Sequence, residues 1–437
     1  DLFGDEAQYW LWSQTIDLGY YSKPPLLAWV VGVITYVFGS GFVVLKLIPF
    51  AMYIFSAYLV CLVSYQLYKN KNLAIISAIS FYLMPGVSVS SFILSTDVFL
   101  IFFWLLCLFV LLKIRNKPHL INFLMLGVFL GLAFLTKYAA VYFLLSLFLF
   151  LFLDTRLRGV FFEKTLYVFL FIITFIIVLL PNIIWNIKNN WITISHTSDN
   201  AALDRIDINL LQGIEFFFIQ TAMIGPLLFL LFFITINKIQ FSFQTKFLLC
   251  FSLPVFLIVL IESVLVRANA NWAAVALPAL LIFLAHHGNK HFKRTVYISN
   301  FINAVFCCFL FFLILTSSSL KVFNRINGIS VFATNLEENY LSDTDILVVE
   351  DRLLFSNLSY LYRDSKKTLL TPFNPTSDVK SSFHLSNPLN PLFSRKFIFV
   401  GSPASINYLT KKNVAIKKEV GSFVFKKEPI EIYEITF

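Results

Sequence analysis

Apolar runs long enough to cross a lipid bilayer dominate much of this 437-residue chain. A helix needs about 17 to 25 apolar residues to span the hydrocarbon core, and such runs recur between residues 43 and 316, separated by short polar loops. Charged residues make up 13% of the sequence, whereas they make up about a quarter of soluble proteins. The sequence therefore predicts a mainly α-helical, polytopic membrane protein. The predicted spans cover residues 43–68, 73–94, 97–112, 120–136, 138–153, 165–185, 208–236, 247–266, 272–285 and 296–316.

The composition changes after about residue 320, where polar and charged residues become frequent. Short β-rich runs at residues 345–350, 396–401, 413–420 and 429–437 alternate with a helical pattern at Arg352–Arg363. We therefore expect two domains: a transmembrane domain over residues 1–319 and a small soluble α/β domain over residues 320–437.

The basic residues separate the loops between spans into two sets. One set, near residues 69–71, 113–117, 156–164, 238–246 and 290–294, holds most of the Lys and Arg of the apolar part, and the positive-inside rule makes it cytoplasmic. The opposite set collects most of the acids, and the same alternation places the C-terminal domain outside. The net charge of +10 is therefore a topology signal, and we expect no nucleic-acid partner.

The stretch "DEAQYWLWSQTIDLGYYSKPPLLAW", residues 5–29, is polar and aromatic although it lies in the apolar part of the chain. The run that follows Pro25 has 13 apolar residues before Gly39, which is too short to cross a bilayer but suits a helix lying in the interface. Residues 5–29 are therefore predicted to belong to an outer-face loop with juxtamembrane helices. Because the sequence begins at Asp1 without an initiator methionine, we also expect a first span upstream.

Several ionisable groups converge on this outer face from distant parts of the chain. Ionisable groups at a membrane are costly and by default mark function. A carboxylate can activate a nucleophile while cations hold an anionic leaving group. The convergent groups are Asp5, Glu6, Lys23, Asp97, Lys137, the loop at 181–200 and the motif "RANANW" at 267–272.

Taken together, the motifs resemble those of bacterial members of the protein O-mannosyltransferase superfamily. The similarity covers roughly residues 1–285 and rests on the opening carboxylate pair, "Y-x-K-P-P-L-x-x-W", "STDVFL" and "G-L-x-x-x-T-K-Y". "PNIIWN" and "RANANW" also look like the family 39 glycosyltransferases, and the lipid A aminoarabinose transferases share the most similar pattern. The resemblance implies a GT-C fold and a membrane glycosyltransferase in the bacterial inner membrane, with its active site facing the periplasm.

Carried over to this sequence, the resemblance makes Asp5 the candidate catalytic base and Asp97 a second acidic site residue, with Glu6 as a further candidate. Lys23 would hold the phosphate of a polyprenyl-phosphate sugar donor. The acceptor would be a lipid such as lipid A, a glycan or a protein, and membrane lipids would surround the enzyme. Further candidate contacts to the substrates are Lys137, Arg267, His196, Arg205, Tyr20 and Tyr21. A divalent metal ion is compatible with the family, but no residue in this sequence is assigned to hold one.

Each of these residues also has a structural interpretation. Asp5 and Glu6 could stabilise the start of a surface helix, "STD" around Asp97 could cap a span, and Lys23 could be an interface lysine. The histidine-rich segment at 286–291 has a spacing like that of metal ligands, but it lies on the basic side and is interpreted as a solvated loop.

Two other classes of protein remain open from the sequence. A transporter or lipid flippase would show internal repeats and ionisable residues near the midplane, which are not evident here. An inactive relative acting as a scaffold would not need Asp5, Lys23 and Asp97. The sequence names neither the sugar nor the acceptor.

Overall fold

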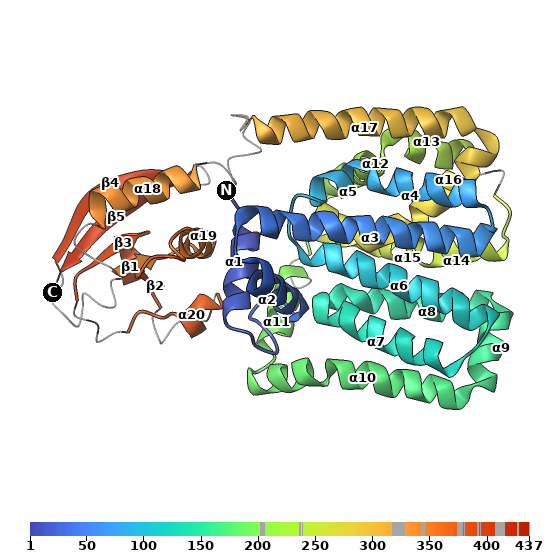
Figure 1. Cartoon of the computed structure of the whole chain (residues 1–437), viewed down its shortest axis with the longest axis horizontal. Coiled ribbons are helices and arrows are strands. Elements are labelled where there is room, and N and C mark those ends of the chain that lie inside the picture. Colours follow the sequence, from blue (N-terminus) through green and yellow to red (C-terminus); the bar gives the residue numbers. More distant parts are fainter. Residues whose placement is uncertain are drawn as a thin grey trace.

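The computed structural model of the chain describes residues 1–436 apart from residues 202–205, 236, 238, 317–327, 342–345, 374–378, 380, 391, 392, 394, 407–415, 426 and 427. A bundle of long helices forms one end of the molecule, and a β-sheet with its own helices forms the other (Figure 1). The predicted domain boundary at residues 319 and 320 lies outside the described residues.

Among the described residues, six helical segments are long and apolar enough to cross a membrane. Two further segments would qualify if each bent pair counts as one span: η1 with α8 and α9 (104°), and α12 with α13 (107°). The six segments are α3 (Phe42–Tyr68), α6 (Thr96–Asn116), α10 (Thr165–Lys188), α14 with α15 (Phe243–Cys250, Leu253–Leu265), η3 with α16 (Ala270–Ala276, Leu277–His291), and α17 (Lys293–Leu315). The bent pairs comprise η1 (Tyr138–Ala140), α8 (Val141–Leu153), α9 (Thr155–Glu163), α12 (Leu210–Ile224) and α13 (Pro226–Thr235).

Several of the ten spans expected from the sequence are not continuous, membrane-length helices in the structure. The run at 73–94 is broken into α4 (Lys71–Tyr82) and α5 (Pro85–Ser90), and the run at 208–236 bends between α12 and α13. Both breaks lie at a proline, which has no backbone N–H with which to continue a helix. At the second break, Gly225 has a φ of +104°. With 17 residues, α7 (Leu120–Thr136) is also shorter than the six long segments.

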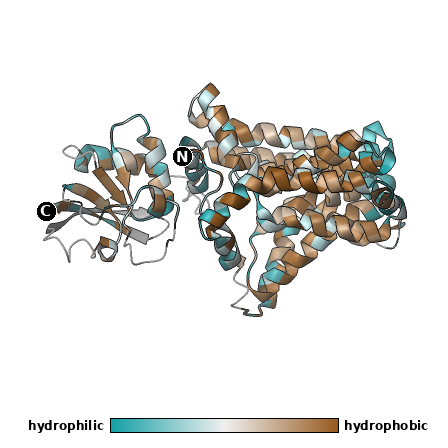
Figure 2. Ribbon diagram, turned by 90° about the horizontal axis from the view of Figure 1, so that it is seen from below, coloured by the Kyte–Doolittle hydropathy of each residue, from teal (hydrophilic) through white to brown (hydrophobic). Residues whose placement is uncertain are grey.

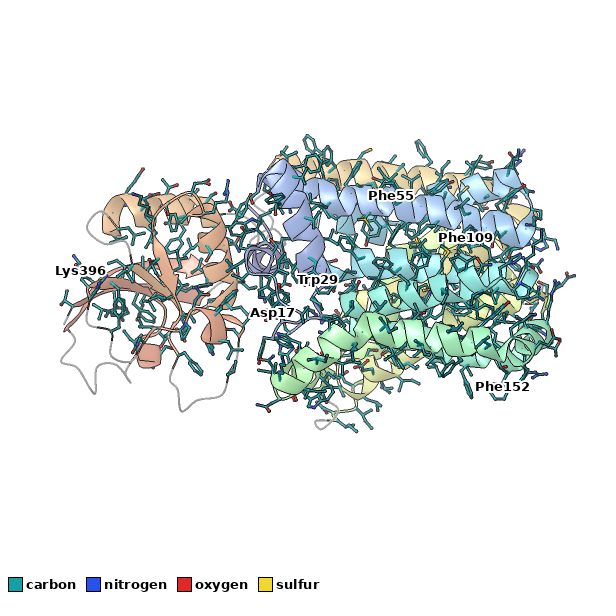
Figure 3. All side chains as sticks on the ribbon, turned by 60° about the horizontal axis from the view of Figure 1, so that its bottom comes forward. Asp17, Trp29, Phe55, Phe109, Phe152 and Lys396 are labelled. Atoms are coloured by element: carbon teal, nitrogen blue, oxygen red, sulfur yellow. The ribbon has the colours of Figure 1, made fainter. Side chains whose placement is uncertain are left out.

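The end of the bundle farthest from the sheet is hydrophilic, whereas the length of the bundle is apolar (Figure 2). That end includes α9, which carries Arg156 and Arg158 (Figure 1). Phe55 and Phe152 are more than half exposed on the bundle (Figure 3), as expected for side chains that face lipid.

Three helices lie at the end of the bundle that faces the sheet: α1 (Gly4–Gln14), α2 (Leu26–Phe38) and α11 (Ile192–Ala201) (Figure 1). The 13-residue helix predicted after Pro25 is confirmed, and it ends at Gly39, whose φ is +80°. The side chain of Trp29 in α2 donates a 2.8 Å hydrogen bond to the carbonyl of Asp17. This bond holds the loop between α1 and α2 against the second helix (Figure 3).

The C-terminal region forms a five-stranded mixed sheet in the order β2-β1-β3-β5-β4. β1 pairs in parallel with β2 and β3, and β5 pairs antiparallel with β3 and β4. The predicted α/β character is confirmed, although the three-residue β2 was missed because it is too short to show a pattern. The elements are α18 (Ile329–Tyr340), β1 (Ile346–Val349), α19 (Arg352–Leu361), β2 (Thr368–Leu370), α20 (Phe383–Ser386), β3 (Phe397–Val400), β4 (Ile416–Phe425) and β5 (Glu428–Thr436).

The C-terminal region packs directly on α1. A Cβ atom added to Gly4 would lie only 2.8 Å from the Cβ of Leu353, so the two helices α1 and α19 approach too closely there for a larger residue. The Trp12 indole donates a 3.0 Å hydrogen bond to Ser382, and the Tyr360 hydroxyl donates one of 2.9 Å to the carbonyl of Ser40. The contact between Gly4 and Leu353 places the start of α19 beside the start of α1.

Glu6 ties α1 to the bundle. Its carboxylate is fully buried and accepts hydrogen bonds from the backbone amides of Phe3 and Leu94, each at 2.8 Å. The ammonium of Lys46 in α3 lies 2.5 Å from the same carboxylate and also donates to the carbonyl of Phe92. Buried charges persist in proteins when they are paired and hydrogen-bonded in this way.

We predict that Glu6→Gln destabilises the protein. The substitution leaves Lys46 without its counter-charge, and breaking a buried pair costs about 3–5 kcal/mol. Because Lys46 keeps 21% of its side chain exposed, we expect a loss at the lower end, about 3 kcal/mol. Thermal unfolding in detergent measures the change. Glu163→Gln, at the exposed end of α9, is the matched control, and an equal stability for Glu6→Gln and the control would contradict the prediction.

Candidate active site

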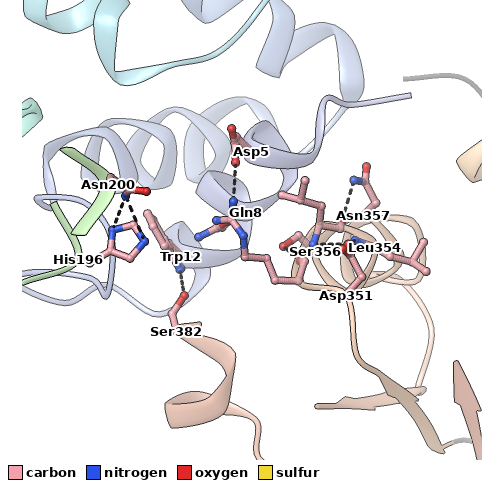
Figure 4. A network of polar contacts seen from close by, with 12 residues as sticks. Asp5, Gln8, Trp12, His196, Asn200, Asp351, Leu354, Ser356, Asn357 and Ser382 are labelled. Carbon is pink, nitrogen blue, oxygen red and sulfur yellow. Dashed lines mark hydrogen bonds and ion pairs between the residues drawn. The ribbon is translucent and has the colours of Figure 1, made fainter. Parts of the chain in front are cut away.

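A cavity of about 550 Å³ lies where α1, the segment before α6, α11, η3 and the start of α19 meet. Figure 4 shows Asp5 and Gln8 on α1 close to His196 and Asn200 on α11. The predicted site residues that line this cavity are Asp5, Lys23, Asp97, Lys137 and His196. The fold therefore brings these five predicted residues together, although they are up to 191 positions apart in the sequence.

Asp5 faces the cavity, whereas Glu6 faces the bundle. Successive residues of an α-helix point about 100° apart because one turn holds 3.6 residues, so the two adjacent acids serve different surroundings. The side chain of Asp5 is 45% exposed, and among the described residues its ionic partner is Arg352, at 3.7 Å. That distance is longer than a hydrogen bond, so the carboxylate remains open to a bound molecule.

Asp97 is buried and holds two other cavity residues. It lies in the first turn of α6, accepts a 2.7 Å hydrogen bond from the ammonium of Lys137, and accepts one of 2.5 Å from the side-chain amide of Asn271. Lys137 is positioned by the break between α7 and η1. Asp97 therefore orients a lysine and an asparagine toward the cavity.

Lys23 faces the cavity as a cation without a close counter-ion. Among the described residues, no carboxylate oxygen lies within 4 Å of its ammonium. Burial lowers the pKa of Lys23, and the positive charge of Lys137 lowers it further, while Asp97 and Asp5 act in the opposite direction. A bound anion would relieve this electrostatic penalty.

A second cavity, of about 410 Å³, shares a wall with the first. Lys23 and Lys137 line both cavities, while Arg267 and Glu262 line only the second. Arg267 therefore shares a cavity with the two lysines but not with Asp5. The two lysines stand at the junction of two spaces, each large enough for part of a substrate.

The remaining predicted contacts differ in their access to the cavities. His196 lines the first cavity and its pKa is lowered by burial, with Lys23 and Arg352 adding to the effect. Tyr21 contacts the His196 ring edge-on at 4.8 Å. Tyr20 is buried, stacks on Trp12, and has a pKa raised to about 12 by burial. Neither tyrosine lines either cavity.

Two further expectations concern residues away from these cavities. Glu6 lines neither cavity, and its role as a site residue stays a prediction. Arg205 lies outside the described residues. In the part of the chain that the structure describes, no three His, Cys, Asp or Glu side chains gather where they could hold a metal ion, so no residue set fits such an ion and no step below uses one.

The asparagines of the motif "PNIIWN" form hydrogen bonds with segments next to the cavity lysines. Tyr138, next to Lys137, donates a 2.9 Å hydrogen bond to Asn182 and accepts one of 3.1 Å from Asn186. Asn182 also donates to the carbonyl of Leu18, in the loop that leads to Lys23. The two asparagines of α10 therefore hold the segments that carry both cavity lysines.

Arg352 is the cavity residue that the sequence did not indicate. It comes from α19 in the C-terminal region, and its guanidinium donates a 2.9 Å hydrogen bond to Gln8. Arg352 is one basic residue among many in that region, and no motif around it in the sequence indicated a site residue. Asn271, by contrast, belongs to "RANANW", which the sequence placed on the same face.

The arrangement suits a substitution reaction with an anionic leaving group. Asp5 offers an open carboxylate that can accept a proton, and Lys23 offers a fixed positive charge in a partly buried site, where electrostatic interactions are stronger than in water. Lys137 and Asn271 are already oriented by Asp97. These groups could act together on one molecule that spans the junction of the two cavities.

Comparison with known proteins gives a consistent result. Residues 22–185 match the family described as dolichyl-phosphate-mannose-protein mannosyltransferase. The chain is 29% identical over 375 residues to the lipid A galacturonosyltransferase RgtD of Rhizobium johnstonii, covering 84% of this chain and 78% of that protein. It is also 29% identical over 136 residues to the undecaprenyl phosphate-alpha-4-amino-4-deoxy-L-arabinose arabinosyl transferase of Wigglesworthia glossinidia brevipalpis, covering 29% of this chain and 24% of that one.

The fold resembles that of ArnT from Cupriavidus metallidurans. The structures of that protein in the apo state and bound to undecaprenyl phosphate each align with a TM-score of 0.65 and 12% sequence identity, over 99% of this chain and 93% of theirs. The match includes the C-terminal sheet region as well as the bundle. The matched family, the relatives and the fold together support the GT-C glycosyltransferase family, and the apolar helices support a multi-pass membrane protein.

Proposed function

We propose that this enzyme transfers a sugar from a polyprenyl-phosphate donor to lipid A or a similar glycolipid at the periplasmic face of the bacterial inner membrane. The observation that carries the proposal is the cavity in which the open carboxylate of Asp5 and the cation Lys23 face the same space. Among the relatives, RgtD is named for lipid A and the arabinosyl transferase for an undecaprenyl phosphate sugar.

The donor phosphate binds at the junction of the two cavities. Of the two lysines there, Lys23 has no carboxylate oxygen within 4 Å among the described residues. A phosphate beside it offsets the repulsion from Lys137. Charge-assisted hydrogen bonds from a lysine to a phosphate are about twice as strong as neutral ones. The second cavity, with Arg267 on its wall, accommodates the start of the polyprenyl chain.

Transfer follows from this placement. A hydroxyl oxygen of the acceptor attacks the anomeric carbon of the sugar, and Asp5 takes the hydroxyl proton as the new glycosidic bond forms. The bond between the anomeric carbon and the phosphate oxygen breaks, and its electron pair stays on the polyprenyl phosphate. Lys23 stabilises that leaving phosphate. Asp97 acts indirectly, because its contacts hold Lys137 and Asn271.

The proposed sidedness rests on the charges at the two ends of the bundle. The basic helix α9 lies at the end far from the cavity, and basic loops face the cytoplasm. The cavity and the C-terminal sheet region are then periplasmic. In this arrangement, residues 1–319 form the transmembrane domain and residues 320–437 a soluble domain that covers the active site.

Asp5→Asn tests the base. Asparagine keeps the size of the side chain but cannot take a proton, so we expect kcat to fall by about 10²- to 10⁴-fold, the usual contribution of general base catalysis. The measurement is transfer of sugar from a polyprenyl-phosphate donor to lipid A by purified enzyme in detergent or nanodiscs. Asp17→Asn, in the exposed loop after α1, is the control, and full activity of Asp5→Asn would refute the assignment.

The pH dependence of donor binding tests Lys23. Only the protonated amine attracts the phosphate. The pKa of Lys23 lies below the ordinary lysine value. As the pH rises, Lys23 therefore loses its proton, and donor binding weakens, at a lower pH than it would with an ordinary lysine. In Lys23→Arg, the guanidinium stays charged throughout this range, so the alkaline rise in donor KM should disappear. Donor KM measured from pH 7 to 10 in both proteins gives the answer, and an identical rise in both would rule out Lys23 as the titrating group.

A further inference from the structure

Arg352 reaches the cavity from the C-terminal region. It is the first residue of α19, whose N-terminus is capped by Asp351 through hydrogen bonds to the amides of Leu353 and Leu354. Close packing of Leu353 on Gly4 sets this end of α19 against α1. The guanidinium then lies 2.9 Å from the side-chain oxygen of Gln8 and 3.7 Å from Asp5.

The contacts of Arg352 leave much of its binding capacity unused. A guanidinium has five N–H donors in a planar fork, and Gln8 accepts one of them. The side chains of Arg352 and Asp5 are 43% and 45% exposed, and ion pairs between such exposed groups add little stability. The stability of the fold therefore does not explain why an arginine faces this cavity.

The cations of the cavity fall into two groups. Lys23 and Lys137 lie in the wall shared with the second cavity, whereas Arg352 lines only the first cavity, on the side of Asp5. Asp97 is engaged with Lys137 and Asn271. Of the carboxylates that line the cavity, Asp5 is left to balance both Lys23 and Arg352. The described residues of the cavity therefore carry more positive than negative charge, in two separate places.

We propose that Arg352 binds an anionic group of the substrates, a carboxylate or a phosphate, on the side of Asp5 away from the donor phosphate. This inference rests on the proposed function, because it takes the two lysines as the place of the donor phosphate. An arginine fork matches either anion with two parallel hydrogen bonds. When the anion binds Arg352, it replaces Asp5 as the partner of the guanidinium, so that Asp5 is free to accept the proton of the attacking hydroxyl.

Two substrates could supply this anion. The transferred sugar could carry a carboxylate, as uronic acids do, or the acceptor glycolipid could carry a phosphate near the attacking hydroxyl. Either anion would place negative oxygens beside Asp5. In either case, the enzyme would prefer a charged substrate over a neutral one. The enzyme would then select its substrates partly by charge, through a residue of the C-terminal region.

The experiment compares wild type with Arg352→Gln and Arg352→Lys, using the full chain in nanodiscs. The donors are a polyprenyl-phosphate uronic acid and the corresponding neutral hexose, and the acceptors are lipid A with and without its phosphates. Steady-state KM and kcat are measured for all four combinations. Arg363→Gln is the control, because Arg363 lies beyond the other end of α19 and its guanidinium contacts the ring and carbonyl of Tyr360.

We expect Arg352→Gln to lose about 10- to 100-fold in kcat/KM, mainly through KM, for the substrate that carries the anion, as expected for the loss of a hydrogen bond to a charged group. Its activity toward the uncharged counterpart should stay near that of wild type, and Arg352→Lys should recover part of the loss. A loss that follows the acidic donor identifies the sugar, and one that follows the phosphorylated acceptor identifies the acceptor.

An equal loss with all four combinations would overturn the proposal, because it would make Arg352 a positioning residue for Asp5 alone. Unchanged kinetics in both variants would also overturn it. If wild type transfers no sugar from either donor, the proposed function fails. The binding of each substrate, measured as thermal stabilisation of wild type and Arg352→Gln, then decides the inference separately: a preference for the anionic substrate that the variant lacks supports it, and equal stabilisation refutes it.

Discussion

The active-site end of the molecule depends on the hydrogen bonds and the ion pair of the buried Glu6 carboxylate. It binds the amides of Phe3 and Leu94 and the ammonium of Lys46, so one side chain joins α1, α3 and the segment before α6. A carboxylate without such partners would be strongly disfavoured in this buried place. Because these partners hold α1, the preceding side chain of the helix, Asp5, is held at the cavity.

A similar arrangement recurs on the other side of the cavity. Asp97 is buried, and its two carboxylate oxygens accept hydrogen bonds from Lys137 and Asn271. These bonds fix both groups before any substrate binds. Groups held in place in this way need no rearrangement as charge develops in a reaction. The paired charges therefore set the geometry of the site. Asp5 and Lys23, which have no such close ion pair, can interact with the substrates.

The sequence predicted those features that depend on local pattern or on a compact motif. Apolar length predicted the long helices, and short β-rich runs predicted four of the five strands. The opening motif placed Asp5 and Lys23 in one loop-and-helix segment, and the structure places both on one cavity. The helix breaks before Pro85 and Pro226 were missed because the hydrophobic run continues across them, although a proline at each marked the site.

The rest of the site depends on contacts between distant parts of the chain. Arg352 lies 344 positions from Gln8, which it contacts, and nothing near it in the sequence separates it from the other basic residues of its region. Likewise, the sequence favoured Asp5 over Glu6 as the catalytic base only through the resemblance, and kept Glu6 as a further site candidate. Their different surroundings follow from the packing of α1 between the bundle and α19, which no local pattern records.

This packing makes the C-terminal region part of the active site. At Gly4 and Leu353, α1 and α19 approach so closely that a Cβ atom on the glycine would not fit. The charged neighbours of these two residues are Asp5, which follows Gly4, and Arg352, which precedes Leu353. The close contact between the Leu353 side chain and Gly4 therefore helps to set the spacing of the open carboxylate and the guanidinium across the cavity. A small displacement of the sheet region would move Arg352 while Glu6 keeps Asp5 in place. It follows that the register between α1 and α19 determines how the two charges meet a substrate.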